Sequence, residues 1–246
     1  MTAVLDTQAA RPVLDAIAEP PAARLAALPG VSTASRVADR AERARTAGRV
    51  LPVVPALAGL LPAAGLRRGS TVAVHGAAAL LTALLAEATA AGSWAAVVGL
   101  PSLGLAAAAE SGVDLGRLAL VPRPGADFPA VVAALLDGVD IVAVHSDTVQ
   151  PAVARRLSAR ARHRGAVLVS SGPWPSADIV LSCRPGEWTG LESGAGHLAE
   201  RRVVVQARGR GAAVRPVSAE LLLPGPSGSV SLATANTDDT EAEAAG

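Results

Sequence analysis

Short apolar runs alternate with longer helix-forming segments through the middle of the chain. The runs are apolar on both faces, which is typical of parallel strands that helices cover on both sides. Strands are predicted at 71–76, 94–100, 117–121, 139–146 and 166–171, and helices at 79–91, 103–112, 127–137 and 150–164. The pattern predicts an α/β fold with a mostly parallel central sheet flanked by helices.

The helical pattern stops after residue 171, and strands alone are expected beyond it. They are predicted at 177–182, 201–211 and 214–225, with a long loop or hairpin over 183–200. Glycine-rich turns separate the last two strands, so we expect antiparallel strands at the C-terminal side of the sheet.

Both ends of the chain differ from this core. We expect residues 1–50 to be an N-terminal extension with one helix, residues 51–225 to be the core, and residues 226–246 to be a disordered acidic tail. The helix of the extension, at 35–47, is a candidate partner contact. No apolar run reaches the length of a membrane span, so we expect a cytoplasmic protein that does not contact a membrane.

Charge is distributed unevenly, although the net charge is only +1. All 22 basic residues are arginine, and residues 155–215 hold eleven arginines but four acids. This excess indicates either an anionic partner or an arginine-rich face that is simply solvated. Aromatic residues make up 2% of the chain, which argues against binding single-stranded nucleic acid by base stacking.

The strand at 71–76 leads into a segment that resembles a broken phosphate-binding loop. Gly76 stands where a strand would enter the G-x-x-x-x-G-K-[ST] loop. Leu81 stands at the second glycine, Thr82 at the lysine and Ala83 at the hydroxyl position. The charge that would meet the terminal phosphates is therefore absent, although the start of the helix could hold an anion weakly.

Two further elements of an ATPase are missing. The strand at 139–146 ends in His145, where a magnesium-binding carboxylate is expected. The strand at 94–100 ends in Gly99 and Leu100, where a residue that orients water is expected. We therefore predict a degenerate nucleotide site formed by Gly76, Leu81, Thr82, Gly99 and His145. We expect no catalytic residue and no cofactor, with ATP as the alternative ligand.

The remaining polar candidates favour structural roles. His75 and His145 end strands that could be neighbours, but two ligands are too few for a metal site. Cys183 is the single cysteine, and we expect a buried thiol and no metal. Trp174 and Trp188 lie in loops rich in Pro and Gly, and we expect buried indoles that anchor those loops. Exposure at a partner interface is the alternative.

The helix at 150–164 is the most basic element of the chain. Val153, Leu157 and Ala161 share one face, while five arginines populate the rest. This is typical of a surface helix, or of a helix that contacts DNA phosphates or an acidic partner. The candidate contact residues are Arg155, Arg156, Arg160, Arg162 and Arg164 on this helix, and Arg208 and Arg210 on a late strand.

Several phrases resemble the RecA ATPase core over roughly residues 51–228. "GLRRGSTVAVHG" resembles the turn and strand that enter the phosphate loop, and "VDIVAVHS" resembles the Walker B strand. "RRVVVQARGRGAAVRPVSAELLLPGPSG" resembles the late strands. Within that superfamily, "AAVVGLPSLGLAAAAESGVDLGRLALVPRPG" and "ALLDGVDIVAVH" resemble the actinobacterial ImuA-prime type.

The resemblance implies an accessory protein of a DNA-damage-induced mutagenesis cassette. Its partners would be a polymerase-like protein of the ImuB type and an error-prone DNA polymerase complex, with RecA or DNA as further candidates. The activity of the set would be translesion synthesis. Because the ATP-site positions lack their chemistry, we expect a non-catalytic RecA-like adaptor. The alternatives are an ATP-binding or ATPase repair protein that uses partner residues, and a protein that binds DNA through its phosphates.

Overall fold

The computed structural model describes residues 48–145, 149–192 and 195–233. The chain divides into two units, Met1–Gly48 and Arg49–Gly246, and the described helices and strands belong to the second. The expected N-terminal helix at 35–47 lies outside the described residues. No helix among the described residues is both long and apolar enough to cross a membrane.

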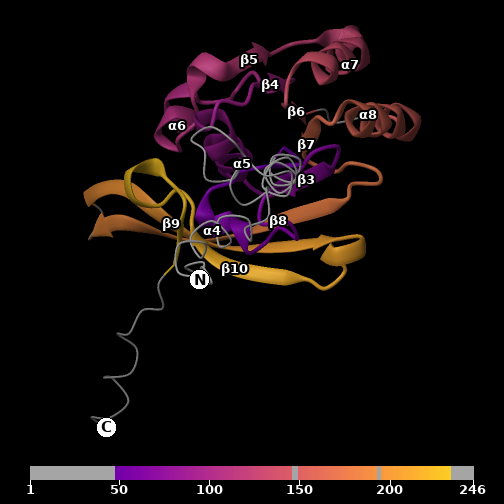
Figure 1. Ribbon diagram of the computed structural model, residues 1–246. Helices are drawn as coiled ribbons and strands as arrows, with labels where there is room; N and C mark the ends of the chain where they lie inside the picture. Colours follow the sequence, from indigo (N-terminus) through magenta and orange to yellow (C-terminus); the bar gives the residue numbers. More distant parts are fainter. Residues whose placement is uncertain (1–47, 146–148, 193–194, 234–246) are drawn as a thin grey trace, which may run out of the picture. The chain divides into compact units, whose positions relative to one another are not determined.

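A nine-stranded mixed sheet forms the centre of the described part, in the order β11-β10-β9-β8-β3-β7-β6-β4-β5. The strands from β8 to β5 are parallel, and β9, β10 and β11 are antiparallel additions on one side (Figure 1). Their bounds are β3 Thr71–His75, β4 Ala95–Val98, β5 Leu118–Val121, β6 Ile141–His145, β7 Val167–Ser171, β8 Ile179–Glu192, β9 Ala195–Gly209, β10 Val217–Leu222 and β11 Ser231–Leu232. A separate pair, β1 Val50–Leu51 with β2 Leu66–Arg67, precedes the sheet.

Helices cover both faces of the sheet, each over its own apolar core. One core holds α4 Pro55–Ala58, α5 Ala78–Ala90 and a side chain of α6 Leu105–Glu110. The other holds α7 Phe128–Gly138 and α8 Pro151–Arg164. The expected α/β fold is confirmed, and the mixed sheet with its helical layers is consistent with a RecA-like fold.

The sequence of each layer explains its place. α5 is buried on almost all sides, because Ala and Leu occupy nearly every position and leave no polar face. α8 is amphipathic, with Ala154, Leu157 and Ala161 buried and its arginines exposed. Pro151 begins this helix, and Gly165 ends it in the left-handed conformation at φ 71°, a position that glycine occupies without steric cost.

The C-terminal side departs from the expected boundaries in two places. The strand expected at 177–182 continues to Glu192, so that most of 183–200 forms the β8–β9 hairpin. The expectation of disorder over 226–246 is wrong for 226–233, because a 3-10 turn and β11 lie there. β11 is ordered because it pairs with Leu221 and Leu222 of β10. Residues 234–246 lie outside the described residues.

Candidate functional site

The β3–α5 turn is too short to form a phosphate-binding loop. β3 ends at His75 and α5 begins at Ala78, so only Gly76 and Ala77 connect them. Gly76 has φ 92°, and a Cβ there would overlap the carbonyl oxygen of Cys183, well inside the 3.0 Å that real Cβ atoms keep. This glycine is therefore required by the close approach of β8, a role that needs no bound phosphate.

The residues after the turn belong to the core. Leu81 is almost fully buried, and the hydroxyl of Thr82 donates to the carbonyl of Ala79 at 2.9 Å. The Leu81 side chain therefore packs in the core, and the Thr82 hydroxyl is bonded within its own helix. A hollow of about 230 Å³ lies beside this first turn of α5, and its described lining includes Glu110 and no basic residue. A carboxylate there would repel a phosphate.

Packing also explains two further positions of the predicted nucleotide site, Gly99 and His145. Gly99 has φ 79°, and a Cβ there would overlap the carbonyl oxygen of His145. A carboxylate side chain at this position would therefore be strained. The ring nitrogen Nδ1 of His145 lies 2.7 Å from the carbonyl oxygen of Ser171, so its imidazole is tied to the neighbouring strand β7.

The two strand-end histidines are not neighbours. β7 lies between β3 and β6 in the sheet, so His75 and His145 are separated by a whole strand. The expectation that their strands could be neighbours is wrong, because strand order depends on crossover connections that the local pattern does not reveal. No group of three or more potential metal ligands occurs in the described ranges.

The arginines of α8 are divided between ion pairs and free positions. Arg160 and Arg164 both bind the carboxylate of Asp137 on α7, Arg160 through its Nε at 2.7 Å and Arg164 at 3.0 Å. Arg162 lies 3.8 Å from Asp178. Arg155 and Arg156 are exposed, and neither forms an ion pair within the described part of the chain. Among the α8 arginines, only these two form no ion pair with a described residue, so their charges could meet an external anion.

The pairing with arginine changes how Asp137 titrates. The hydrogen bond from Arg160 holds the pKa of Asp137 below its ordinary value, and the charges of Arg160 and Arg164 act in the same direction. The same hydrogen bond raises the pKa of Arg160. Arg160 and Arg164 thus hold α8 against α7, which makes them less suitable as contacts for an external anion.

The three described tryptophans differ in exposure. Trp174 is buried, and its indole nitrogen donates to the hydroxyl of Ser158 on α8 at 2.9 Å, which confirms the anchoring role. Trp188 is not buried in a loop. It lies on β8 with 42% of its surface exposed, and the guanidinium of Arg201 lies 5.4 Å from its ring centroid. The alternative of an exposed aromatic therefore applies to Trp188.

Cys183 behaves as expected for a structural thiol. It is buried, and desolvation raises the pKa of its thiol despite the opposing charge of Arg201. Its carbonyl is the group that approaches Gly76. Both parts of this residue therefore belong to the junction between β3 and β8.

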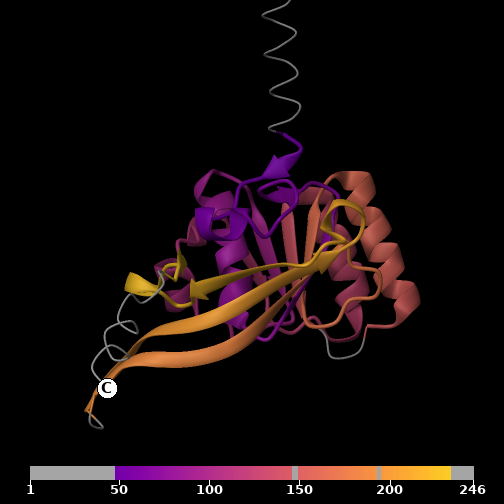
Figure 2. The ribbon, with the colours of Figure 1, turned by 90° about the horizontal axis from the view of Figure 1, so that it is seen from below.

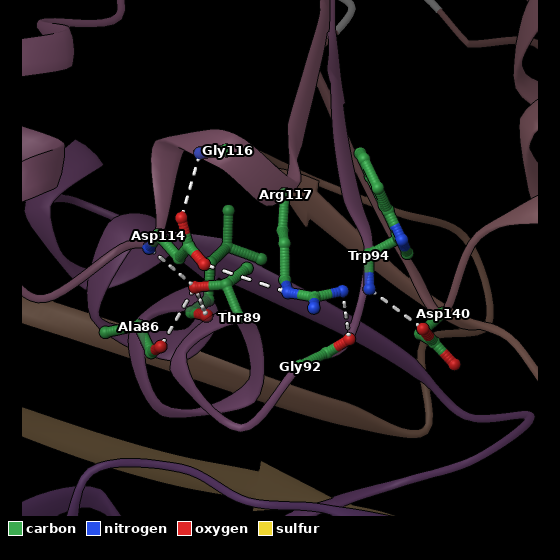
Figure 3. Close-up of polar contacts among 9 residues, drawn as sticks. Ala86, Thr89, Gly92, Trp94, Asp114, Gly116, Arg117 and Asp140 are labelled. Atoms are coloured by element: carbon green, nitrogen blue, oxygen red, sulfur yellow. Dashed lines mark hydrogen bonds and ion pairs between the residues drawn. The ribbon is translucent and has the colours of Figure 1, made fainter.

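A polar network at the amino ends of β4 and β5 was not anticipated from the sequence (Figure 3). The hydroxyl of Thr89 accepts from the backbone of Asp114, whose carboxylate pairs with Arg117 at 3.7 Å. Arg117 donates to the carbonyl of Gly92 at 2.8 Å and lies 5.8 Å from the ring centroid of Trp94. The network ties the end of α5 to the starts of these two strands.

Asp140 extends this network towards β2. Its carboxylate accepts from the backbone of Trp94 at 2.9 Å and from Arg68 at 2.6 Å. Arg68 and Asp140 are 72 residues apart in the sequence, so no local motif could reveal their pairing. By contrast, the Asp114 turn, in which the carboxylate accepts from Gly116, is a local pattern that the phrase "VDLGR" could have indicated.

The late-strand arginines occupy different positions. Arg208 lies on β9 opposite Val180 and is exposed. Arg210 follows the end of β9, and its backbone donates to the carbonyl of Asp178 at 3.0 Å. The structure therefore does not gather the predicted contact arginines into one site. It separates Arg155 and Arg156 on α8 from Arg208 and Arg210 at the end of β9.

Two comparisons with known proteins each match about half of this chain. A family model described as the MT3502 N-terminal domain matches residues 59–176. The uncharacterized protein Rv3395c of Mycobacterium tuberculosis is 44% identical over 119 residues, which is 47% of this chain and 58% of that protein. The match thus spans little more than half the length of this relative. The family model ends at residue 176, so it includes the β3–α5 turn and α8 but stops before the β8–β9 hairpin.

Proposed function

We propose that this protein is a non-catalytic RecA-like adaptor of the ImuA-prime type. It would bind a polymerase-like partner within a complex for DNA-damage-induced translesion synthesis. The observation that carries this proposal is the closed connection between β3 and α5. The carbonyl of Cys183 approaches Gly76, and Leu81 and Thr82 are packed or bonded within the protein. The resemblance to the RecA core supports the choice of partner.

The distal half of the β8–β9 hairpin is the surface best suited to such a partner. β8 pairs with β3 only through Ser182, and β9 pairs with β10 only from Arg202 onwards. Apart from Arg201, whose backbone bonds Leu223 and Pro224, the described residues beyond these positions pair only across the hairpin. Figure 2 shows the two strands continuing past the helical layers. A two-stranded hairpin is marginally stable in water by itself.

Exposed apolar side chains gather on this part of the hairpin. Trp188, Leu191 and Leu198 are exposed by 42%, 55% and 50%. Because about half of each side chain is already covered, burying the rest on association would contribute about 1 kcal/mol for each one, roughly half the value for a fully exposed side chain. Aromatic residues in such positions are common anchors of protein interfaces. A partner that packs on the hairpin would therefore both bind this protein and stabilise its two strands.

A co-purification experiment tests the adaptor role. The full chain is expressed with the ImuB-type protein, and the Leu191→Ser/Leu198→Ser variant is expected to weaken their association by at least about tenfold, because exposed apolar area is removed from the interface. The matched control is Leu120→Ser on β5, whose exposure of 40% is comparable but which lies at the opposite edge of the sheet. Association that is unchanged by the hairpin variant would contradict this placement of the interface.

An ATP test separates the adaptor from the ATPase alternative. The isolated protein and the complex are both assayed for ATP binding and hydrolysis, and neither is expected to hydrolyse ATP. Hydrolysis by the complex that a Thr82→Ala substitution abolishes would contradict the non-catalytic proposal. Thr82 is preferable to Gly76 as the test position, because any side chain at Gly76 would disturb the β3–β8 junction.

The second candidate function, DNA binding through phosphates, rests on Arg155 and Arg156. Both are exposed and unpaired within the described ranges, whereas Arg160 is bound to Asp137. If they contact two phosphates, Arg155→Gln/Arg156→Gln should reduce the slope of log affinity against log salt by about 2. Fluorescence anisotropy with duplex DNA measures this slope, and Arg123→Gln, an exposed arginine on the loop before α7, serves as a control outside α8. An unchanged slope would remove these residues as DNA contacts.

A further inference from the structure

A hollow of about 430 Å³ lies at the end of the sheet opposite the β3–α5 turn. Ser70, which directly precedes β3, lines it together with Asp178 and Ile179 at the start of β8. The loop before β2 and the turn after β9 form its sides. Its described lining includes Pro62, Arg67, Ser70, Asp178, Ile179 and Arg210. The volume lies within the usual range for small-molecule sites, about 300–1,000 Å³.

Two arginines give this hollow its charge. Arg67 comes from β2 and Arg210 from the turn after β9, so the two cations come from separate parts of the fold. Both are exposed, and neither guanidinium pairs with an acid in the described residues. Positive charge beside apolar walls attracts an anion more strongly than it does in open solvent.

The one acidic residue in the described lining is already engaged. The carboxylate of Asp178 accepts from the backbone of Thr71 at 2.9 Å, and its other oxygen lies 3.8 Å from Arg162. Its charge is therefore offset by groups that belong to the fold. Arg67 and Arg210 remain uncompensated within the described ranges, and the hollow presents a net positive charge.

We propose that this hollow binds a terminal phosphate group, with Arg67 and Arg210 as its two cationic contacts. A phosphate monoester carries about −1.5 to −2 charge and three acceptor oxygens, which two separate guanidinium groups can share. A carboxylate has two oxygens and one charge, so one arginine fork satisfies it. The apolar side chains of Pro62 and Ile179 line the hollow and could contact an organic group attached to the phosphate.

Two kinds of ligand carry such a terminal phosphate: a free mononucleotide and the 5′-phosphate end of a nucleic-acid strand. The proposed site lies at the amino ends of β3 and β8, away from the degenerate loop at Gly76. It goes beyond the proposed adaptor function, because a phosphate ligand at this end of the sheet requires neither a polymerase-like partner nor ATP hydrolysis.

Isothermal titration of the full chain with AMP and with adenosine tests the proposal. AMP is expected to bind and adenosine to bind at least about tenfold more weakly, because only AMP offers the charged hydrogen-bond acceptors. Arg67→Gln and Arg210→Gln should each weaken AMP binding about tenfold or more. Arg123→Gln, an exposed arginine on the loop before α7, should leave the affinity within about twofold, as a charge-matched control.

A steric variant keeps the test independent of charge. Ala63 lines the hollow and is exposed, so Ala63→Phe should fill the space without disturbing the core and should abolish binding. Equal affinity for AMP and adenosine would overturn the proposal, as would equal losses in Arg67→Gln and Arg123→Gln. The absence of binding by AMP and by every oligonucleotide would also overturn it.

Oligonucleotides distinguish the two sources. A 5′-phosphorylated single strand that binds more tightly than AMP, and whose 5′-hydroxyl form does not, identifies a strand end as the source. AMP that binds at least as tightly as the phosphorylated strand identifies a free nucleotide. Equal binding of the phosphorylated and 5′-hydroxyl strands overturns the terminal-phosphate assignment. A synthetic acidic peptide that binds more tightly than either phosphate probe, with the same dependence on Arg67 and Arg210, also overturns it.

Discussion

Replacing Gly76 with alanine introduces a side chain where the backbone of β8 leaves no space. The new Cβ would overlap the carbonyl oxygen of Cys183, and the residue must keep φ near 92°. The conformation alone costs a residue other than glycine about 1–2 kcal/mol. Moving β8 to relieve the overlap adds about 1–3 kcal/mol, the usual cost of overpacking. We therefore expect Gly76→Ala to lower the free energy of unfolding by about 2–5 kcal/mol.

Gly165→Ala is the matched control for the conformational part. Gly165 also has a positive φ, 71°, but a Cβ there would meet no atom within 4 Å. This variant should lose only about 1–2 kcal/mol. The difference between the two variants then measures the steric overlap at the β3–β8 junction. Gly99→Ala, which would meet the carbonyl of His145, should behave like Gly76→Ala.

Urea denaturation followed by far-ultraviolet circular dichroism measures all three variants, provided that the slope with denaturant is unchanged. If Gly76→Ala is no less stable than Gly165→Ala, the close approach of Cys183 is not what requires glycine at this position. The explanation of Gly76 as a packing residue would then be refuted, and a ligand-binding role for the turn would regain support.

Three further outcomes test the packing around α8 and β8. Trp174→Phe removes the hydrogen bond to Ser158 and should cost about 1–2 kcal/mol in thermal or urea unfolding; no loss would mean that the bond adds nothing to stability. The pKa of Asp137 is lowered from 3.8 by Arg160, so the stability from this pair is complete above that value and is lost as the pH falls through the lower folded value. Asp137→Asn should therefore reduce the dependence of the free energy of unfolding on pH below about pH 4. A variant whose free energy of unfolding changes with pH in the same way as that of the original protein would contradict the pairing. Because burial raises the pKa of Cys183, its thiol should react with a disulfide reagent near neutral pH only after unfolding; rapid reaction in the native protein would show that it is accessible.

The sequence predicted the elements of the helical core because their signals are local. β3, β4, β6 and β7 are apolar on both faces, and the helices between them have the composition and length that the fold requires. The absence of a lysine after Gly76 could also be read directly from the residues there, which include Leu81 and Thr82. The reason for the glycine itself could not, because Cys183, whose carbonyl approaches it, lies far away in the chain.

Arginine function illustrates the same limit. The sequence pattern predicted exposed positions for five arginines of α8 and gave no reason to distinguish among them as contacts. The fold separates them, because Asp137 on α7 binds Arg160 and Arg164 and leaves Arg155 and Arg156 unpaired in the described residues. Arg67 lies in the phrase "GLRRGSTVAVHG" but had no predicted role, and it became a candidate only when the fold brought β2 beside the turn that carries Arg210.

The amino-acid sequence by itself determined the α/β class, the order of its strands and helices along the chain, and the lack of a basic residue in the segment after Gly76. These properties depend on hydrophobic period and residue identity within short windows. Only the tertiary structure decided that β7 separates His75 from His145, that the hairpin exposes Trp188, and that Arg67 and Arg210 share a hollow. Such relations depend on strand order and on contacts between distant segments, which no local pattern of side chains specifies.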